Sequence, residues 1–208
     1  MLLIARRLDK LQAVAEAVGG AELIAADLAS DDGLERVALE LERRQPDLLV
    51  NNAGFGTQGL FHETPLDRQM EMHRLHVMAT VRLSQAVLPA MVERNAGGII
   101  DVASVASFGR SVGNVSYCAT KAWMAAFSEG LYLEMRRAAP GVSIQALCPG
   151  FTYSEFHDVA GIDRAKISSS LWLQTGDVVR VSLDSFAPIQ SMTAVPSWTS
   201  PILYVIPV

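Results

Sequence analysis

The sequence has few cysteines, little net charge and no long apolar run. Its two cysteines, Cys118 and Cys148, stand in unrelated contexts, so we expect reduced thiols in a cytoplasmic protein. No apolar run reaches the roughly 20 residues of a membrane-spanning helix. The apolar start of the chain is too short for a signal peptide, and its basic residues follow it. We therefore expect no membrane partner and no secretory leader.

The charge balance also excludes a class of partner. Seventeen Lys and Arg residues against 22 Asp and Glu residues give a net charge of −5, which argues against nucleic acid as a partner. Hydrophobic residues make up 50% of the chain, which excludes general disorder. The 208 residues are enough to bury a core without disulfides. We expect a single domain over residues 1–208.

Short apolar runs alternate with longer helical patterns along the chain. The predicted strands cover residues 2–5, 22–26, 47–51, 99–103 and 142–147, and the predicted helices cover residues 8–18, 31–44, 65–93 and 115–137. Apolar strands that alternate with helices predict an α/β fold, with a parallel sheet covered on both faces.

Chemically unusual residues follow three of these strands. They are Asn51 to Gly54, Ser104, and the pair Pro149-Gly150. Ligands of open parallel sheets bind at the carboxyl ends of the strands. The sequence therefore predicts a ligand site at this edge of the sheet.

Tyr117 and Lys121 are four residues apart in a predicted helix, so their side chains share one face. An ammonium about 4 Å from a phenolate, at an effective dielectric constant near 20, stabilises it by roughly 4 kcal/mol. That would lower a tyrosine pKa from about 10 by two or three units and permit general acid–base catalysis. Ser104 would hold a substrate carbonyl beside the tyrosine. An ordinary surface pair is the alternative interpretation of this spacing.

Taken together, these motifs resemble the short-chain dehydrogenase/reductase family. The resemblance rests on Asn51-Asn52-Ala53-Gly54, Ser104, Tyr117 with Lys121, and Pro149-Gly150, in matching order over residues 1–160. It implies a Rossmann-like, doubly wound sheet in three layers. It also implies an oxidoreductase that interconverts a carbonyl and a secondary alcohol by hydride transfer with a nicotinamide cofactor.

The resemblance assigns roles to these positions. Tyr117 would transfer the proton, Lys121 would lower its pKa and bind the nicotinamide ribose, and Ser104 would orient the substrate oxygen. The implied cofactor contacts are Asn51, Asn52, Ala53 and Gly54 on the adenosine side, Asp27 and Leu28 at adenine, Pro149, Gly150 and Thr152 against the nicotinamide, and Ser154 at its carboxamide.

Arg6 and Arg7 follow the first strand, where the family contacts the adenosine ribose. An acidic residue there would accept from the 2′-hydroxyl, whereas arginine accommodates a 2′-phosphate. Ala5 occupies the acidic position, so the sequence favours NADP(H) over NAD(H). A solvated basic start of a helix remains the alternative.

The chain departs from the family at its start. It has no Gly-rich turn to seat a pyrophosphate at a helix N-terminus, and its first strand corresponds to the family's second. A strand–helix unit of about 30 residues is missing by this comparison. We therefore expect a truncated Rossmann-like domain whose sheet lacks its central strand and has an open edge.

His76 stands where the family has an asparagine that helps to hold a water for proton relay. Histidine also binds water and titrates near neutrality, so we place His76 in the predicted site. His73 and His76 have no further ligands nearby, so we expect no metal. Segment 151–174 matches the family's substrate loop, with Trp172 as an apolar wall.

The end of the chain and its assembly are further expectations. Residues 185–208 contain no charged residue and four prolines, which indicates either a buried tail or an unselected sequence. The two long helices carry surplus apolar residues, and such helices pair across subunits in the family, so we expect a homodimer or homotetramer. Two alternatives remain open for the function: a non-catalytic remnant unable to bind cofactor, and a sugar-nucleotide epimerase or lyase.

Overall fold

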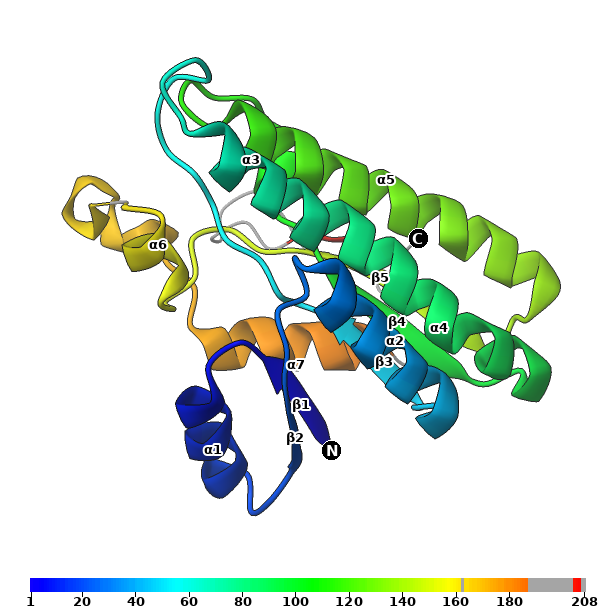
Figure 1. Cartoon of the computed structure of the whole chain (residues 1–208). Coiled ribbons are helices and arrows are strands. Elements are labelled where there is room, and N and C mark those ends of the chain that lie inside the picture. The colour runs from blue at the N-terminus through cyan, green and yellow to red at the C-terminus, as the bar shows by residue number, and fades with distance from the viewer. Residues whose placement is uncertain (162, 187–203, 207–208) are drawn as a thin grey trace.

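The computed structural model describes residues 1–161, 163–186 and 204–206, in which strands and helices alternate (Figure 1). The strands are β1 (Leu2–Ala5), β2 (Glu22–Ala25), β3 (Leu48–Asn51), β4 (Gly97–Val102), β5 (Val142–Cys148) and β6 (Tyr204–Ile206). The helices are α1 (Leu8–Ala17), α2 (Asp31–Arg44), α3 (Leu66–His73), α4 (Ala79–Arg94), α5 (Val115–Ala138), α6 (Phe156–Val159) and α7 (Thr175–Ser185). The predicted α/β class is confirmed.

The strands form two sheets among the described residues. β1 pairs in parallel with β2, and a second sheet has the order β3-β4-β5-β6, in which β6 runs antiparallel to β5. The antiparallel β6 and the division into two sheets both differ from the single parallel sheet that was expected. The division falls between β1 and β3, where the expected sheet would have its central strand.

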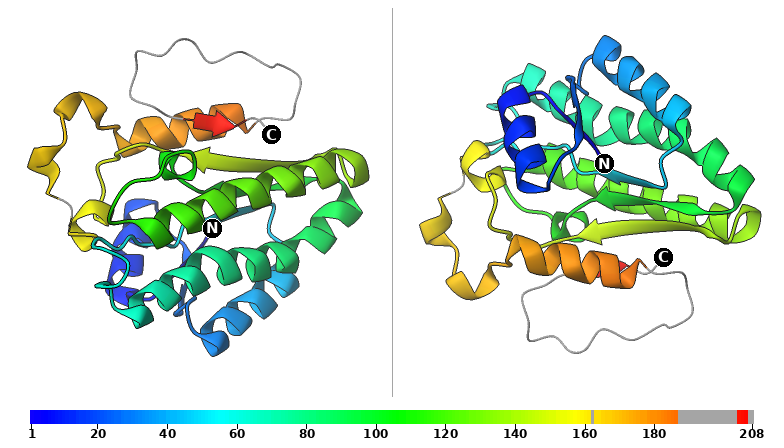
Figure 2. Two further views of the ribbon diagram at one scale, coloured as in Figure 1. Left: turned by 90° about the horizontal axis from the view of Figure 1, so that it is seen from above. Right: turned by 90° about the horizontal axis from the view of Figure 1, so that it is seen from below.

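Helices cover both faces of the second sheet, which gives the expected three layers (Figure 2). Helices α2, α3, α4 and α5 cover one face, and α1 and α7 lie on the other side. Val37 of α2, Val87 of α4 and Ile99 of β4 are fully buried between the sheet and the first helical layer. On the opposite face, Val178 of α7 packs with Ile100 and Leu147.

One face of β3 is less well covered than the rest of the sheet. Leu49 and Asn51 are buried toward α4, whereas Leu48 and Val50 on the other face are 40% and 49% exposed. No ladder joins β3 to β1 in the described part of the chain. The open strand edge that the sequence predicted is therefore present at β3.

Helix α2 shows how local signals set the bounds of an element. The Ser30 side chain caps it by accepting from the Gly33 N–H at 3.1 Å, and two aspartates occupy the first turn. Arg43 and Arg44 stand in the last turn, where cations favour the helix dipole. The helix spans the residues that the sequence predicted.

The long helix predicted over residues 65–93 is divided by a π-turn at Arg74–Met78, between α3 and α4. The stretch Leu66–Arg94 is long and apolar enough to cross a membrane by length and composition alone. In this structure it packs on the sheet, with Met72 and Met91 fully buried. Part of its apolar content is therefore used in the core.

Cys118 and Cys148 are free and buried, as expected for reduced thiols. The uncharged segment predicted for residues 185–208 lies outside the described residues, apart from residues 185, 186 and 204–206.

Candidate active site

The carboxyl ends of β4 and β5 lie side by side and bring the predicted catalytic residues together. Ser104 follows β4, and the Val105 N–H donates to the Pro149 carbonyl after β5 at 3.1 Å. The Ser104 hydroxyl oxygen accepts from the Ala106 N–H at 3.2 Å, which fixes the serine at the turn. The structure therefore places Ser104 beside Pro149-Gly150 at one edge of the sheet.

Tyr117 lies on the first turn of α5 and faces this edge. The Ser104 hydroxyl lies close enough to favour the ionised form of the Tyr117 phenol. The Lys121 Nζ atom is 5.9 Å from the centre of the Tyr117 ring, and the His76 ring centre is 6.0 Å from it. The four predicted catalytic residues therefore form one cluster.

Burial changes the acidity of both Tyr117 and Lys121. It raises the pKa of Tyr117 to about 12, and the neighbouring Ser104 side chain opposes this only in part. Burial lowers the pKa of Lys121 to about 8, and its ammonium donates to the Val102 carbonyl at 2.7 Å. The sequence predicted a lowered tyrosine pKa. That prediction is wrong for this structure, because the ammonium bonds to the strand and burial dominates.

The carboxylate of Asp101 is buried near Lys121. The side-chain amide of Asn51 and the Ser128 hydroxyl each donate to the Asp101 carboxylate at 2.8 Å. Asp101 is fully buried, and burial raises its pKa despite these bonds. The side chain of Asn51 therefore supports the sheet interior. Sequence reasoning missed Asp101, although an acid within the apolar run of β4 was a visible signal.

His76 lies in the π-turn and is completely buried. The Phe55 N–H donates to its Nε2 at 3.2 Å, and its Nδ1 is 2.9 Å from the Thr120 hydroxyl. Burial lowers the pKa of His76 to about 2. The expectation that it titrates near neutrality is therefore wrong, because the ring is enclosed and both of its nitrogens are engaged.

The residues expected at the adenosine end lie at the carboxyl ends of β1, β2 and β3. Arg6 and Arg7 follow β1, with side chains 53% and 61% exposed. They form ion pairs at 2.8 Å with Glu71 and Glu155. Exposed guanidinium groups can exchange such weak partners for a phosphate.

The remaining predicted cofactor residues are a mixture of exposed and buried groups. Leu28 is buried after β2, and Asp27 accepts from the Ala29 N–H at 3.0 Å. Asn52, Ala53 and Gly54 are exposed after β3. Thr152 donates to the Gly150 carbonyl at 3.1 Å, and Ser154 is exposed beside it. Several of these positions are exposed at the carboxyl edge of the sheet, and the sequence has no Gly-rich turn for a pyrophosphate.

The predicted substrate loop folds around its own aromatic rings. Trp172 is 8% exposed and packs on Tyr153 and His157, with ring centres 4.8 and 4.6 Å away. The ring that reaches Tyr117 is Phe156, at 5.6 Å. Sequence reasoning chose Trp172 as the wall and missed Phe156, which the run of aromatics around residue 153 could have indicated.

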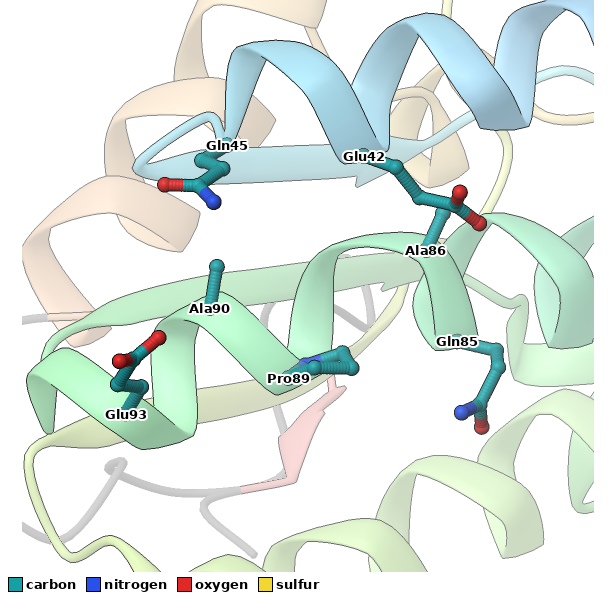
Figure 3. Close-up of a pocket in the computed structure, with 7 residues that line it drawn as sticks. All are labelled: Glu42, Gln45, Gln85, Ala86, Pro89, Ala90 and Glu93. Carbon is teal, nitrogen blue, oxygen red and sulfur yellow. The ribbon is translucent and has the colours of Figure 1, made fainter.

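A hollow between α2 and α4 lies apart from this site (Figure 3). Its volume is about 420 Å³, and it is lined by Glu42, Gln45, Gln85, Ala86, Pro89, Ala90 and Glu93. None of the predicted site residues lines it. A second hollow, of about 480 Å³, includes Asp27 together with Asp67, Glu71 and Arg74.

Comparison with known proteins gives the family. The family model for short chain dehydrogenases matches residues 1–164. An uncharacterized oxidoreductase of Myxococcus xanthus is 36% identical over 156 residues, which are 72% of this chain and 61% of that protein. Nodulation protein G of Rhizobium meliloti is 33% identical over 73% of this chain and 62% of its own length. The chain thus spans about three-fifths of the length of these relatives.

Solved structures agree with the sequence matches. A short-chain dehydrogenase from Sphingobium yanoikuyae in complex with NADPH has a TM-score of 0.82 and 31% identity, covering 89% of this chain and 73% of that one. L-sorbose reductase from Gluconobacter frateurii, complexed with NADPH and L-sorbose, has a TM-score of 0.65 and 29% identity, covering 73% of this chain and 59% of its own. The resemblance seen in the motifs is therefore confirmed, and the chain belongs to the short-chain dehydrogenase family of oxidoreductases.

Proposed function

We propose that this chain acts in an NADP(H)-dependent oxidoreductase that interconverts a carbonyl compound and a secondary alcohol. The observation that carries the proposal is the cluster of Ser104, Tyr117 and Lys121, in which the Lys121 Nζ atom is 5.9 Å from the centre of the Tyr117 ring. A substrate carbonyl oxygen at this edge would accept from the hydroxyl groups of Ser104 and Tyr117.

The protonation states favour the reductive direction near neutral pH. With a pKa of about 12, Tyr117 is protonated and can act as the acid. It donates its proton to the substrate oxygen as negative charge develops there, while Ser104 holds that oxygen. Lys121, with a pKa of about 8, is mainly an ammonium at pH 7, and it would stabilise the tyrosinate that remains if it turned from the Val102 carbonyl toward Tyr117.

A nicotinamide cofactor, when bound, supplies the hydride. Arg6 and Arg7 would hold its 2′-phosphate, and Asp27, Leu28 and Asn51 to Gly54 would lie along adenosine. Pro149, Gly150, Thr152 and Ser154 would lie at the nicotinamide. Support comes from the exposure of both guanidinium groups and from the NADPH complex of the Sphingobium relative.

A homodimer or homotetramer is the proposed assembly. The structure leaves apolar side chains of the long helices at the surface, among them Met78 at 58% and Leu133 at 59% exposure. Exposed apolar surface of this kind favours association. The free, buried cysteines support a cytoplasmic location.

The test is NADPH oxidation with a panel of ketones and aldehydes. We expect Tyr117→Phe to abolish turnover with an unchanged circular dichroism spectrum, and Ser104→Ala to lower the rate by roughly 10²–10⁴. Tyr132→Phe is the control, because it removes the same hydroxyl from the same helix. Near wild-type turnover in Tyr117→Phe would refute the assignment. No turnover and no NADPH binding by the wild-type chain would favour the non-catalytic alternative.

A further inference from the structure

We propose that His76 is a positioning residue for Tyr117, a neutral ring that joins the loop after β3 to the first turns of α5 and carries no proton in the reaction. The proposal rests on the function proposed above for Tyr117.

The π-turn places the ring between two separate elements. His76 lies within Arg74–Met78, where the helix is locally widened, and it is 0% exposed. Phe55, in the loop after β3, contacts one ring nitrogen, and Thr120 of α5 contacts the other. π-turns inside helices are frequent at functional sites. Here the π-turn directs the His76 side chain toward both Phe55 and Thr120.

The hydrogen bonds select one tautomer. The Thr120 hydroxyl donates its single proton to the Tyr117 carbonyl at 2.9 Å, so it faces His76 Nδ1 as an acceptor. The Phe55 N–H donates to Nε2, so that nitrogen carries no proton. Two independent partners therefore both require the Nδ1–H form, and neither ring nitrogen is left to bind a relay water.

The surrounding charges also keep the ring neutral. Lys121 on α5 and His73 on the preceding turn both disfavour a cation at His76, in addition to burial. Tyr117, the other titratable group against the ring, is protonated near neutral pH. A second ring proton would also point at the Phe55 N–H. The ring is therefore neutral at and around neutral pH.

Gly54 shows how closely the loop approaches the ring. A Cβ atom at Gly54 would lie 2.5 Å from His76 Nε2, much closer than side-chain atoms approach one another. A continuous series of hydrogen bonds then runs from Phe55 through His76 and Thr120 to the backbone of Tyr117. His76 thus sets where the phenol of Tyr117 lies relative to Ser104.

The first test is nitrogen-15 NMR of the ¹⁵N-histidine-labelled chain, which needs neither cofactor nor turnover. We expect His76 to show a protonated Nδ1 and an unprotonated Nε2, with no titration between pH 5 and 9. The exposed His62 serves as a reference signal in the same spectra. A protonated Nε2, or titration of His76 within this range, would overturn the proposal whether or not the chain proves to be an enzyme.

The second test separates positioning from proton transfer. Thr120→Val removes the acceptor for Nδ1–H, and we expect kcat to fall roughly ten- to a hundredfold with little change in KM or in the pH profile of kcat. Thr120→Ser keeps the hydroxyl and should restore kcat. If His76 carried protons, His76→Gln would remove a limb of the pH profile while Thr120→Val would leave kcat almost unchanged, and that pattern would refute the proposal.

Discussion

The buried lysine should make the stability of the fold depend on pH in a calculable way. Lys121 is 5% exposed, and burial lowers its pKa from 10.5 to about 8. The folded protein therefore binds this proton less tightly than the unfolded chain does. At pH 7 Lys121 is protonated in both states, so the folded state carries the full penalty. The penalty falls as pH rises from 8 to 10.5, and stability due to this residue increases over that window.

The size of the effect follows from the shift. At about 1.4 kcal/mol per pKa unit, the penalty is roughly 3 kcal/mol at pH 7. At pH 9.5 the folded lysine is mainly neutral and the unfolded one still mainly charged, which leaves a penalty of about 1 kcal/mol. Replacement by methionine, of similar length and without charge, removes the penalty at both pH values. It also leaves the Val102 carbonyl without its donor, at a cost of about 1–3 kcal/mol that does not depend on pH.

Urea unfolding of wild type and Lys121→Met at pH 7 and pH 9.5 measures this difference. We expect wild type to gain roughly 2 kcal/mol relative to the variant between these pH values. Lys10→Met is the control, since Lys10 is 53% exposed. The difference in unfolding free energy between wild type and Lys10→Met should be the same at pH 7 and at pH 9.5. A difference between wild type and Lys121→Met that does not change with pH would refute the reasoning.

Three further predictions concern the cofactor, the reaction and the assembly. Arg6→Ala and Arg7→Ala together should abolish any preference for NADPH over NADH in a fluorescence titration, and an unchanged preference would contradict the 2′-phosphate assignment. Because the pKa of Tyr117 is about 12, alcohol oxidation should accelerate from pH 7 to 10 while ketone reduction should not, and parallel pH profiles would contradict this. Light scattering coupled to size exclusion should show a dimer or tetramer, and replacing the exposed Met78 and Leu133 by Gln should shift it toward monomer. If the wild-type chain is a monomer at every micromolar concentration measured, the proposed homodimer or homotetramer is excluded.

Most helices and strands could be predicted from the sequence because the spacing of their apolar residues indicates which face is buried. Helix α2 is the clearest case, since its charges and apolar positions lie within its fourteen residues and its cap, Ser30, directly precedes them. The π-turn at Arg74–Met78 could not be predicted in this way, because it depends on where the His76 ring finds partners in other elements. The antiparallel pairing of β6 is likewise a long-range choice that no local pattern encodes.

The members of the site could be predicted better than their orientations. Parallel strands bring their carboxyl ends to one edge, so Ser104 and Pro149-Gly150 had to lie close together once the strands were identified. The sequence does not indicate which way a side chain turns at that edge. Asn51 points inward to Asp101, and Lys121 bonds to the Val102 carbonyl. Both directions depend on packing between α5 and the sheet.

The acidity of Tyr117 depends on how the side chains of the site are oriented as much as on which residues form the site. An ammonium about 4 Å from the phenolate would contribute roughly 4 kcal/mol toward ionisation. The rise of the tyrosine pKa from 10.0 to about 12 corresponds to roughly 3 kcal/mol against ionisation. The two effects are similar in size, so the sign of the shift is decided by where the Lys121 ammonium lies. Because it donates to Val102 here, burial determines the outcome, and Tyr117 is held in the protonated form that a proton donor requires.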